Sequence, residues 1–408
     1  MKTNRSIGLF LRHAFALFIV GVLLINPLCV PGSSNAVEVI ELETDAAAAP
    51  FGIDDPTPRF SWRLLTSKRA VLQKRYRVLV ASKPELLKEG KADVWDSRTI
   101  ATTNEWAIYA GRMLRSRTRY YWSVKVDTAD GASSNWSKPE WFETAYLNES
   151  EWKGQWIAGP VRPGIFSETE GYADIDVFRR SDEFCRPTAW LTSGFAAERF
   201  KNDLGECREP RPAPMLRKSF TISKPVAKAR IYSAGLAYNH LTLNGKPTSD
   251  SVLDPNFTDY SKTVLYTTHD VTALLRQGEN VIASELGSGH FDDATKTWDW
   301  GWEQAQWRAR PRLRLDLYVT FADGSEQLIS SDNSWKTGNA GPTRYDSLYL
   351  GETYDARLKV AGWDQPGFND STWWSARVVK GPRGVLAAQT NEPIRVVDVR
   401  SPGTRTER

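Results

Sequence analysis

The sequence predicts an all-β protein built from two successive sandwich domains. Short apolar runs interrupted by Gly, Pro, Asn and Asp recur after residue 36, whereas apolar residues at helical spacing are scarce. The length of 408 residues suffices for two or three domains of ordinary size. In the second half, candidate strands outnumber candidate helices and are joined by long connections, a pattern typical of jelly rolls.

Residues 1–36 are predicted to be a cleaved secretory signal peptide. Basic residues precede an apolar run from Ala14 to Ile25, and Ser34 and Ala36 supply a small-x-small cleavage pattern. No later apolar run approaches the ~20 residues that span a bilayer. We therefore expect a secreted or periplasmic protein with no membrane span after signal removal.

The cysteines bear on the same compartment. Cys29 leaves a lipoprotein anchor as an alternative, although Pro27 and Leu28 stand where small residues normally precede a lipidated cysteine. The other two cysteines, Cys185 and Cys207, are expected to form a disulfide in an oxidising compartment. Two separate buried thiols are the alternative.

The charge of the chain excludes a large class of partners. The 53 Lys and Arg residues include three in the signal segment, so the mature chain is nearly balanced against its 49 Asp and Glu residues. No basic stripe stands out, and nucleic acid is not expected as a partner. With four histidines and no metal-ligand spacing, the sequence leaves any metal site unknown.

Residues 37–148 are predicted to form the first sandwich. Candidate strands are RFSWRL, YRVLVAS and VWDSRTI, followed by a long hairpin at 119–145 that reverses near Asp130 and Gly131. In this hairpin four side chains alternate toward the core, namely Tyr120, Trp122, Val124 and Val126. The pattern resembles a fibronectin type III domain, with its tryptophans in the core.

Residues 149–382 are predicted to form the jelly roll, with an irregular insertion at about 162–214 that contains both cysteines. Strand patterns resume at Met215 and continue to residue 332. One helix is expected, at 270–280, where Asp270 caps the first turn, Leu274 and Leu275 face the core and Gly278 ends it.

The stretch 289–312 combines four tryptophans with four carboxylates, a mixture unsuited to a buried strand. Three tryptophans alternate in an extended segment and would point to one side: Trp298, Trp300 and Trp302. That side meets either a sugar or a neighbouring domain. Trp307 is expected to anchor the next strand in the core.

Two long runs, 216–291 and 349–379, resemble the N-terminal β-sandwich of bacterial alpha-L-rhamnosidases. The resemblance implies a further β-sandwich next, then an (α/α)6 barrel with the catalytic carboxylates, then a C-terminal β domain. Residues 383–408 resemble the first strand of that next sandwich. We therefore expect the non-catalytic N-terminal part of a secreted alpha-L-rhamnosidase, truncated before its barrel. A stand-alone lectin-like protein is the alternative.

The resemblance also implies a ligand, because some relatives bind terminal rhamnose with calcium nearby. The partners expected are a rhamnose-containing glycan and the missing catalytic domain. No cofactor is required, and calcium is a candidate. The candidate carbohydrate-binding residues are Trp298, Trp300, Trp302, Asp292, Asp293 and Asp299. No catalytic pair is assigned, since inversion needs an acid and a base roughly 6.5 to 9.5 Å apart on a suitable scaffold.

Two further motifs have both a structural and a functional interpretation. In 254–262, a ligand site would use Asn256, Asp259 and Tyr260, but the same residues are typical of turns, which is the favoured interpretation. Another set, Glu352, Asp355 and Arg357, is a candidate contact with a catalytic domain.

Overall fold

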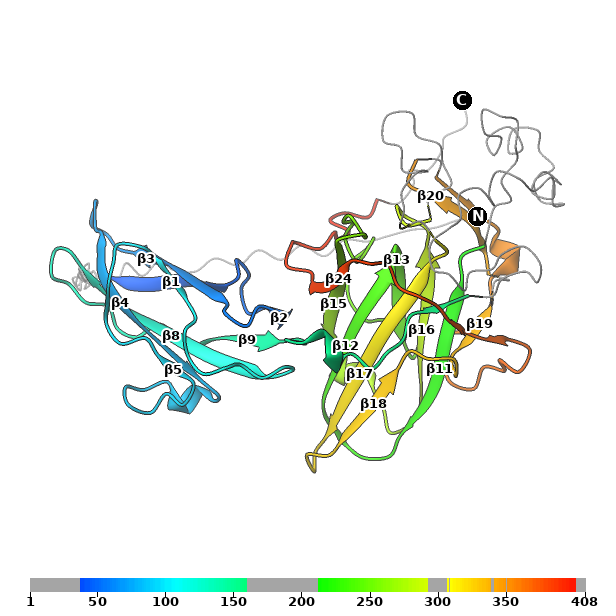
Figure 1. The fold of residues 1–408 in the computed structure, drawn as a ribbon, viewed down its shortest axis with the longest axis horizontal. Helices are drawn as coiled ribbons and strands as arrows, with labels where there is room; N and C mark the ends of the chain where they lie inside the picture. Colours follow the sequence, from blue (N-terminus) through cyan, green and yellow to red (C-terminus); the bar gives the residue numbers. More distant parts are fainter. Residues whose placement is uncertain are drawn as a thin grey trace, which may run out of the picture.

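The computed structural model describes residues 37–159, 212–292, 307, 309–338, 341–349 and 351–400. In these residues the secondary structure consists of β-strands and 3-10 helices of three residues, which confirms the all-β class. Two sandwiches lie next to each other along the long axis of the molecule (Figure 1). Within the described ranges, no helix has the length and apolar character needed to cross a membrane.

The first sandwich consists of a three-stranded and a six-stranded sheet. The smaller sheet has the order β1 (Glu38–Thr44), β3 (Arg59–Leu65), β7 (Trp106–Ile108). The larger has the order β2 (Phe51–Ile53), β9 (Glu140–Thr144), β8 (Arg119–Thr128), β4 (Gln73–Ala81), β5 (Trp95–Asp96), and β6 (Ile100–Ala101) also pairs with β4. A 3-10 helix, η1 (Pro84–Leu86), follows β4.

The alternation expected in the long hairpin is confirmed. The four side chains of β8 that were expected to point inward are at most 4% exposed: Tyr120, Trp122, Val124 and Val126. Across the sandwich, the Phe60 ring packs 4.6 Å from the Trp122 ring. The chain reverses at Gly131, whose φ of +88° suits glycine in a tight turn.

The second sandwich has a seven-stranded and a six-stranded sheet. The larger has the order β23 (Arg377–Val378), β10 (Ile157–Ala158), β17 (Arg312–Phe321), β12 (Val226–Leu236), β15 (Thr263–Asp270), β24 (Val385–Ala388), and β18 (Glu326–Ser330) also pairs with β17. The smaller has the order β14 (Lys246–Pro247), β13 (Tyr238–Leu243), β16 (Gly278–Gly287), β11 (Met215–Ile222), β19 (Lys336–Gly338), β22 (Trp374–Ser375). A separate hairpin joins β20 (Thr343–Ser347) to β21 (Gly351–Tyr354). Two more 3-10 helices are η2 (Glu149–Glu151) and η7 (Ala356–Leu358).

The helix expected at 270–280 is shorter than expected. Only η5 (Thr272–Leu274) is helical, because β15 extends to Asp270 and β16 begins at Gly278. The Asp270 carboxylate accepts a hydrogen bond from the Thr272 N–H at 3.0 Å, but the residue at the N-cap of η5 is Val271, so the expected capping by Asp270 is not formed. Leu274 and Leu275 pack against the core between the sheets, as expected.

The end of the described chain differs from the expected start of a further sandwich at 383. β24 pairs in parallel with β15, from Thr263 opposite Val385 to Tyr266 opposite Ala388. A single bridge between Ser251 and Arg395 follows. Residues 385–388 therefore belong to the second sandwich, because they complete the edge of its larger sheet.

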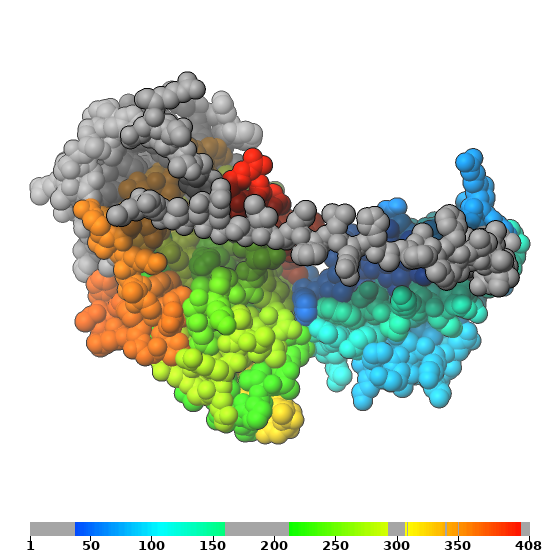
Figure 2. All heavy atoms as spheres, turned by 180° about the vertical axis from the view of Figure 1, so that it is seen from behind, coloured from blue at the N-terminus to red at the C-terminus, as the bar shows by residue number. Residues whose placement is uncertain are grey.

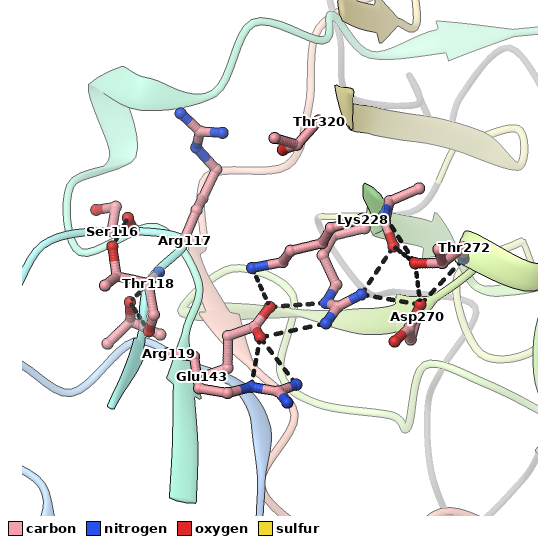
Figure 3. A network of polar contacts seen from close by, with 12 residues as sticks. Ser116, Arg117, Thr118, Arg119, Glu143, Lys228, Asp270, Thr272 and Thr320 are labelled. Atoms are coloured by element: carbon pink, nitrogen blue, oxygen red, sulfur yellow. Dashed lines mark hydrogen bonds and ion pairs between the residues drawn. The ribbon is translucent and has the colours of Figure 1, made fainter. Parts of the chain in front are cut away.

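The two sandwiches are joined by a buried ionic cluster. Three cations pair with Glu143 of β9, namely Arg230 at 2.7 Å, Lys228 at 3.0 Å and Arg119 at 3.1 Å. Figure 3 shows Lys228 and Arg119 pointing toward the Glu143 carboxylate. Glu143 is 1% exposed. Burial alone would raise the pKa of Glu143, but its cationic partners hold it below the usual range. The cluster thus links the end of the first sandwich to β12 of the second.

A second buried carboxylate fixes the connection between the domains. Asp316 of β17 is fully buried and accepts hydrogen bonds from the Tyr146 hydroxyl at 2.8 Å and from the Lys153 and Gly154 N–H groups at 2.9 and 2.8 Å. Tyr146 and Trp152 pack with Tyr232 and Tyr266 on the outer face of the larger sheet. Figure 2 shows the atoms of the two sandwiches in contact at this junction.

Candidate functional site

The structure describes only part of the predicted carbohydrate site. Asp292 is described, whereas five residues predicted to act with it lie outside the described residues: Trp298, Trp300, Trp302, Asp293 and Asp299. Cys185 and Cys207, their expected disulfide, the signal segment and the insertion up to residue 211 also lie outside them. These expectations stay predictions. The described residues form the base of the site.

Aromatic packing fixes both ends of the segment that contains the three tryptophans. Phe291 is 1% exposed, and its ring lies 5.5 Å from that of Tyr260. On the other side, the Trp307 ring lies 5.9 Å from Tyr260. The Ala309 N–H donates to the Phe291 carbonyl at 3.4 Å, which holds the two ends together. Trp307 is thus packed against a core cluster, as expected.

The approach to Asp292 leaves no room for a side chain at Gly289. Its φ is +44°, and a Cβ there would lie 2.5 Å from the Cβ of Ala237. Three residues later, the Asp292 N–H donates to the Ser288 carbonyl at 3.0 Å. This tight turn directs the chain from β16 toward the tryptophan segment.

Asp346 of β20 is the acidic residue that holds this turn in place. It accepts hydrogen bonds from the Ser288 N–H at 2.7 Å and from the Ser288 hydroxyl at 3.1 Å. Burial raises the pKa of Asp346 to about 6, with further increases from the negative charges of Asp292 and Glu352 and an opposing effect of the Ser288 hydrogen bonds. The Asp346 carboxyl therefore keeps its proton to a higher pH than an ordinary aspartate does.

Asp292 itself is a buried, paired carboxylate. It is 9% exposed, and its Oδ2 lies 3.8 Å from a guanidinium nitrogen of Arg310. In the part of the chain that is described, no three His, Cys, Asp or Glu side chains are placed to hold a metal ion.

The base of the site combines acceptor oxygens with aromatic rings. The His290 ring lies 4.3 Å from that of Phe257, beside the turn that carries Asp292. Carboxylates accept hydrogen bonds from hydroxyl groups, and rings pack on the apolar face of a sugar. A neutral hydroxylated ligand fits this chemistry better than an anion, which the acidic residues would repel.

Sequence reasoning missed Asp346 because it lies 54 positions beyond Asp292 and only the β20–β21 hairpin brings the two together. Its local sequence, RYDSL, has no binding motif. The one available signal was the raised density of carboxylates between residues 346 and 355, which sequence reasoning assigned to contact with another domain.

The two other motifs form local structure. Asp259 accepts hydrogen bonds from the Ser261 N–H at 3.0 Å and hydroxyl at 2.5 Å, and Tyr260 is 2% exposed, so the favoured turn interpretation of 254–262 holds. The backbone N–H of Asn256 donates a hydrogen bond to the side-chain oxygen of Gln389 at 2.8 Å. Asp355 caps η7 and pairs with Arg357 at 2.7 Å. Glu352 is exposed on β21, and its contact with another domain stays a prediction.

Two family models match this chain, one for each sandwich. The Rha78A-like, N-terminal immunoglobulin domain matches residues 39–148, and the alpha-L-rhamnosidase N-terminal domain matches residues 224–398. Immunoglobulin and fibronectin type III domains share the sandwich architecture, so the first match agrees with the expected class.

Curated relatives and solved structures extend the similarity along the chain. An alpha-L-rhamnosidase of Formosa agariphila is 33% identical over 327 residues, covering 79% of this chain and 31% of the relative. The structure of alpha-L-rhamnosidase from Dictyoglumus thermophilum matches 90% of this chain and 37% of its own, with 33% identity and a TM-score of 0.72. The structure of the Streptomyces avermitilis alpha-L-rhamnosidase complexed with L-rhamnose matches 89% of this chain and 47% of its own, with 26% identity and a TM-score of 0.73. The chain spans between 31% and 47% of the length of these curated relatives.

Proposed function

Because the chain belongs to the alpha-L-rhamnosidase family and carries its N-terminal domains, we propose that it is the non-catalytic N-terminal part of a secreted alpha-L-rhamnosidase and binds rhamnose-containing glycans. One observation carries the proposal: the two family models match consecutive domains, at 39–148 and 224–398. Their order along the chain is the order expected from the sequence.

The non-catalytic role follows from what hydrolysis requires. An inverting glycosidase places an acid and a base about 6.5 to 9.5 Å apart on either side of the bond, with room for a water. The resemblance assigns these carboxylates to a helical barrel, whereas the described residues here form strands and 3-10 helices. The described acidic residues Glu143, Asp316 and Asp292 are already paired with cations or hydrogen-bond donors. We assign none of them to catalysis.

The glycan-binding role is supported by the base of the tryptophan segment. Phe291 and Trp307 anchor its two ends against Tyr260, so the segment begins and ends on a rigid part of the sandwich. The charges of Asp292 and Asp346 interact, so two carboxylates lie near the start of the segment. The tryptophans of the segment would supply the rings against which the methyl group and apolar face of rhamnose pack.

A hydrolysis assay tests the first half of the proposal. The purified chain without residues 1–36 is incubated with an aryl alpha-L-rhamnoside, and the expected release of the aryl group equals that of the blank. Turnover that persists after repurification contradicts the non-catalytic role. N-terminal sequencing of the protein from the extracytoplasmic fraction tests secretion, with cleavage after Ala36 as the expected result.

Calorimetric titration with L-rhamnose tests the second half. We expect saturable binding that Trp300→Ala weakens at least tenfold, the loss of about 1.4 kcal/mol. Trp374→Ala is the matched control, because Trp374 is 56% exposed on β22, at the edge of the six-stranded sheet, and is not part of the tryptophan segment, so it should leave the affinity unchanged. A parallel titration with a chelator tests calcium. Unchanged affinity in Trp300→Ala would assign the tryptophans to domain packing instead.

A further inference from the structure

A cavity of about 590 Å³ lies between the two sandwiches. We call it the junction cavity. Three stretches of chain line it: residues 43–53 of the first sandwich, residues 249–254 with 267–269 of the second, and residues 388–395 after β24. Figure 1 shows β2 and β24 facing each other across this junction. Its volume lies within the range of about 300 to 1,000 Å³ that is usual for small-molecule sites.

The first wall contributes an aromatic ring and a carboxylate. Phe51 is 38% exposed although its ring packs 4.8 Å from Trp141 and lies 5.0 Å from the Arg230 guanidinium. Asp45 accepts a hydrogen bond from the Arg59 N–H at 2.8 Å, which uses one of its oxygens. This wall therefore contains both an aromatic ring and a hydrogen-bond acceptor.

The second wall contributes His269 and Asp254. His269 is half-buried and, within the described ranges, its side chain has no hydrogen bond or ion pair. Burial lowers the pKa of His269, although the negative charges of Asp254 and Asp250 act in the opposite direction. The lowered pKa favours the neutral imidazole. A neutral imidazole offers one donor and one acceptor. Asp254 is 6% exposed and fixed by Ser251 at 3.0 Å and by Gln389 at 2.9 Å.

The third wall contributes an amide and a neutralised cation. Asn391 is exposed and lines the cavity. Arg395 is the one arginine among the lining residues, and it lies 3.0 Å from Asp250 and 3.7 Å from Glu392. Its charge is therefore already compensated, and the cavity as a whole is acidic.

We propose that the junction cavity binds a neutral saccharide of one or two sugar units. An acidic lining disfavours phosphates, sulfates and uronic acids, whereas hydroxyl groups bind well to carboxylate, amide and imidazole side chains. The exposed ring of Phe51 supplies a surface for the apolar face of a sugar. Both domains contribute to the lining, so the ligand would also hold the sandwiches together.

This site is separate from the described base of the tryptophan segment, because none of the described residues between 289 and 312 lines the cavity. A variant can therefore remove one site and leave the other. Ala48 lines the cavity and is exposed, so Ala48→Trp fills the space without entering a core. Ala110 is an exposed alanine of the first sandwich outside the lining, and Ala110→Trp is its matched control.

The test is a titration of the whole chain with L-rhamnose, D-glucose or D-galactose as probes, monitored by the imidazole signals in a ¹H–¹⁵N spectrum. The chain has four histidines, and His269→Gln identifies the signal of His269. We expect at least one probe to shift this signal saturably. Ala48→Trp should weaken that binding at least tenfold, whereas Ala110→Trp and Trp300→Ala should leave it unchanged. D-Galacturonate, which carries a negative charge, should bind more weakly than D-galactose.

Three results would overturn the proposal. The first is that no neutral sugar shifts the His269 signal. The second is a shift that Ala48→Trp leaves unchanged although its melting temperature equals that of Ala110→Trp. The third is a shift that Trp300→Ala abolishes, because the signal would then report binding at the tryptophan segment. Only this third result would support glycan binding by that segment, so the two proposals fail separately.

Discussion

The Glu143 carboxylate of the first sandwich binds the Arg230 guanidinium of the second through two hydrogen bonds, at 2.7 Å and 3.2 Å. Both side chains are buried, with Glu143 1% and Arg230 5% exposed. Arg230 also pairs with Asp270 at 2.8 Å, while Lys228 and Arg119 contact Glu143. Glu143 is therefore the counter-charge that three cations share, and Asp270 is a second carboxylate partner of Arg230.

Glu143→Gln should destabilise the docked domains by about 3 to 5 kcal/mol, because it leaves the buried Arg230 guanidinium with only the more exposed Asp270 as counter-charge. Scanning calorimetry should show an earlier transition that separates into two as the domains uncouple. Glu326→Gln is the matched control, since Glu326 pairs with Arg117 at the same junction but is 46% exposed. Its effect should stay below about 1 kcal/mol. Equal effects of the two variants would contradict the role assigned to Glu143.

The same cluster predicts an acid limit to docking. The pKa of Glu143 is lowered in the folded protein, so its contribution to stability is present above the ordinary glutamate value of 4.5 and is lost as the pH falls below it. Small-angle scattering at falling pH should show the domains separating before either sandwich unfolds. In Glu143→Gln this pH dependence should be weaker.

Gly52→Ala should disrupt docking for a steric reason. Gly52 has a φ of +74°, and a Cβ there would lie 2.1 Å from the Thr268 hydroxyl of the second sandwich. Gly131→Ala is the matched control, because Gly131 has a φ of +88° and a Cβ at that position would meet nothing within 4 Å. Gly131→Ala should cost only the left-handed backbone penalty of about 1 to 2 kcal/mol. The melting temperature should fall further in Gly52→Ala than in Gly131→Ala, and the difference measures the clash. Equal decreases in the two variants would contradict the steric explanation.

The sandwiches could be predicted because their strands follow a simple alternation. Trp122 and Val124 of β8 are buried as their spacing indicates, and the strand expected at 215–222 coincides with β11. The length of the helix expected at 270–280 was overestimated. Asp270 and Gly278 were interpreted as its two ends, but they belong to the strands on either side. Local signals identify such ends, whereas strand pairing decides how far each element extends.

The junction and the base of the site could not be predicted, because their partners are distant in the sequence. Glu143 lies 87 positions from Arg230 and Asp316 lies 170 positions from Tyr146. When only the local sequence is considered, a charged residue such as Glu143 or Asp316 in an alternating strand indicates a position that faces solvent. Asp346 and Asp292 also lie far apart in the sequence, so the site prediction named Asp292 and missed Asp346.

Exposed valines after β24 predict self-association. Val397 is 97% and Val399 is 83% exposed, and Val396 is 61% exposed. Exposed apolar residues in an extended segment favour contact with another chain. Val397→Asp combined with Val399→Asp should reduce the apparent mass in sedimentation at high protein concentration, with no change in melting temperature. The same apparent mass for both proteins would exclude this segment as the contact.

Asp346 should make stability fall as the pH rises toward neutrality. Its pKa is raised to about 6 from an ordinary value of 3.8, mainly by burial. The folded protein therefore holds this proton more tightly than the unfolded chain does. Its contribution is fully present below pH 3.8 and is lost as the pH rises through about 6. This direction is opposite to that of Glu143, so the two groups can be separated by pH.

Asp346→Asn removes the charge and keeps an acceptor for the Ser288 N–H. The variant should match the wild type near pH 4 and exceed it by about 1 to 2 kcal/mol at pH 7. This is below the ~3 kcal/mol that the full difference in pKa implies, since Asp346 is only half-buried and solvent screens its charge. Urea unfolding at both pH values measures the difference. In Glu352→Gln, the loss of a neighbouring negative charge should lower the pKa of Asp346, which a carboxyl ¹³C titration would detect. An unchanged titration there would show that Glu352 does not contribute to this pKa.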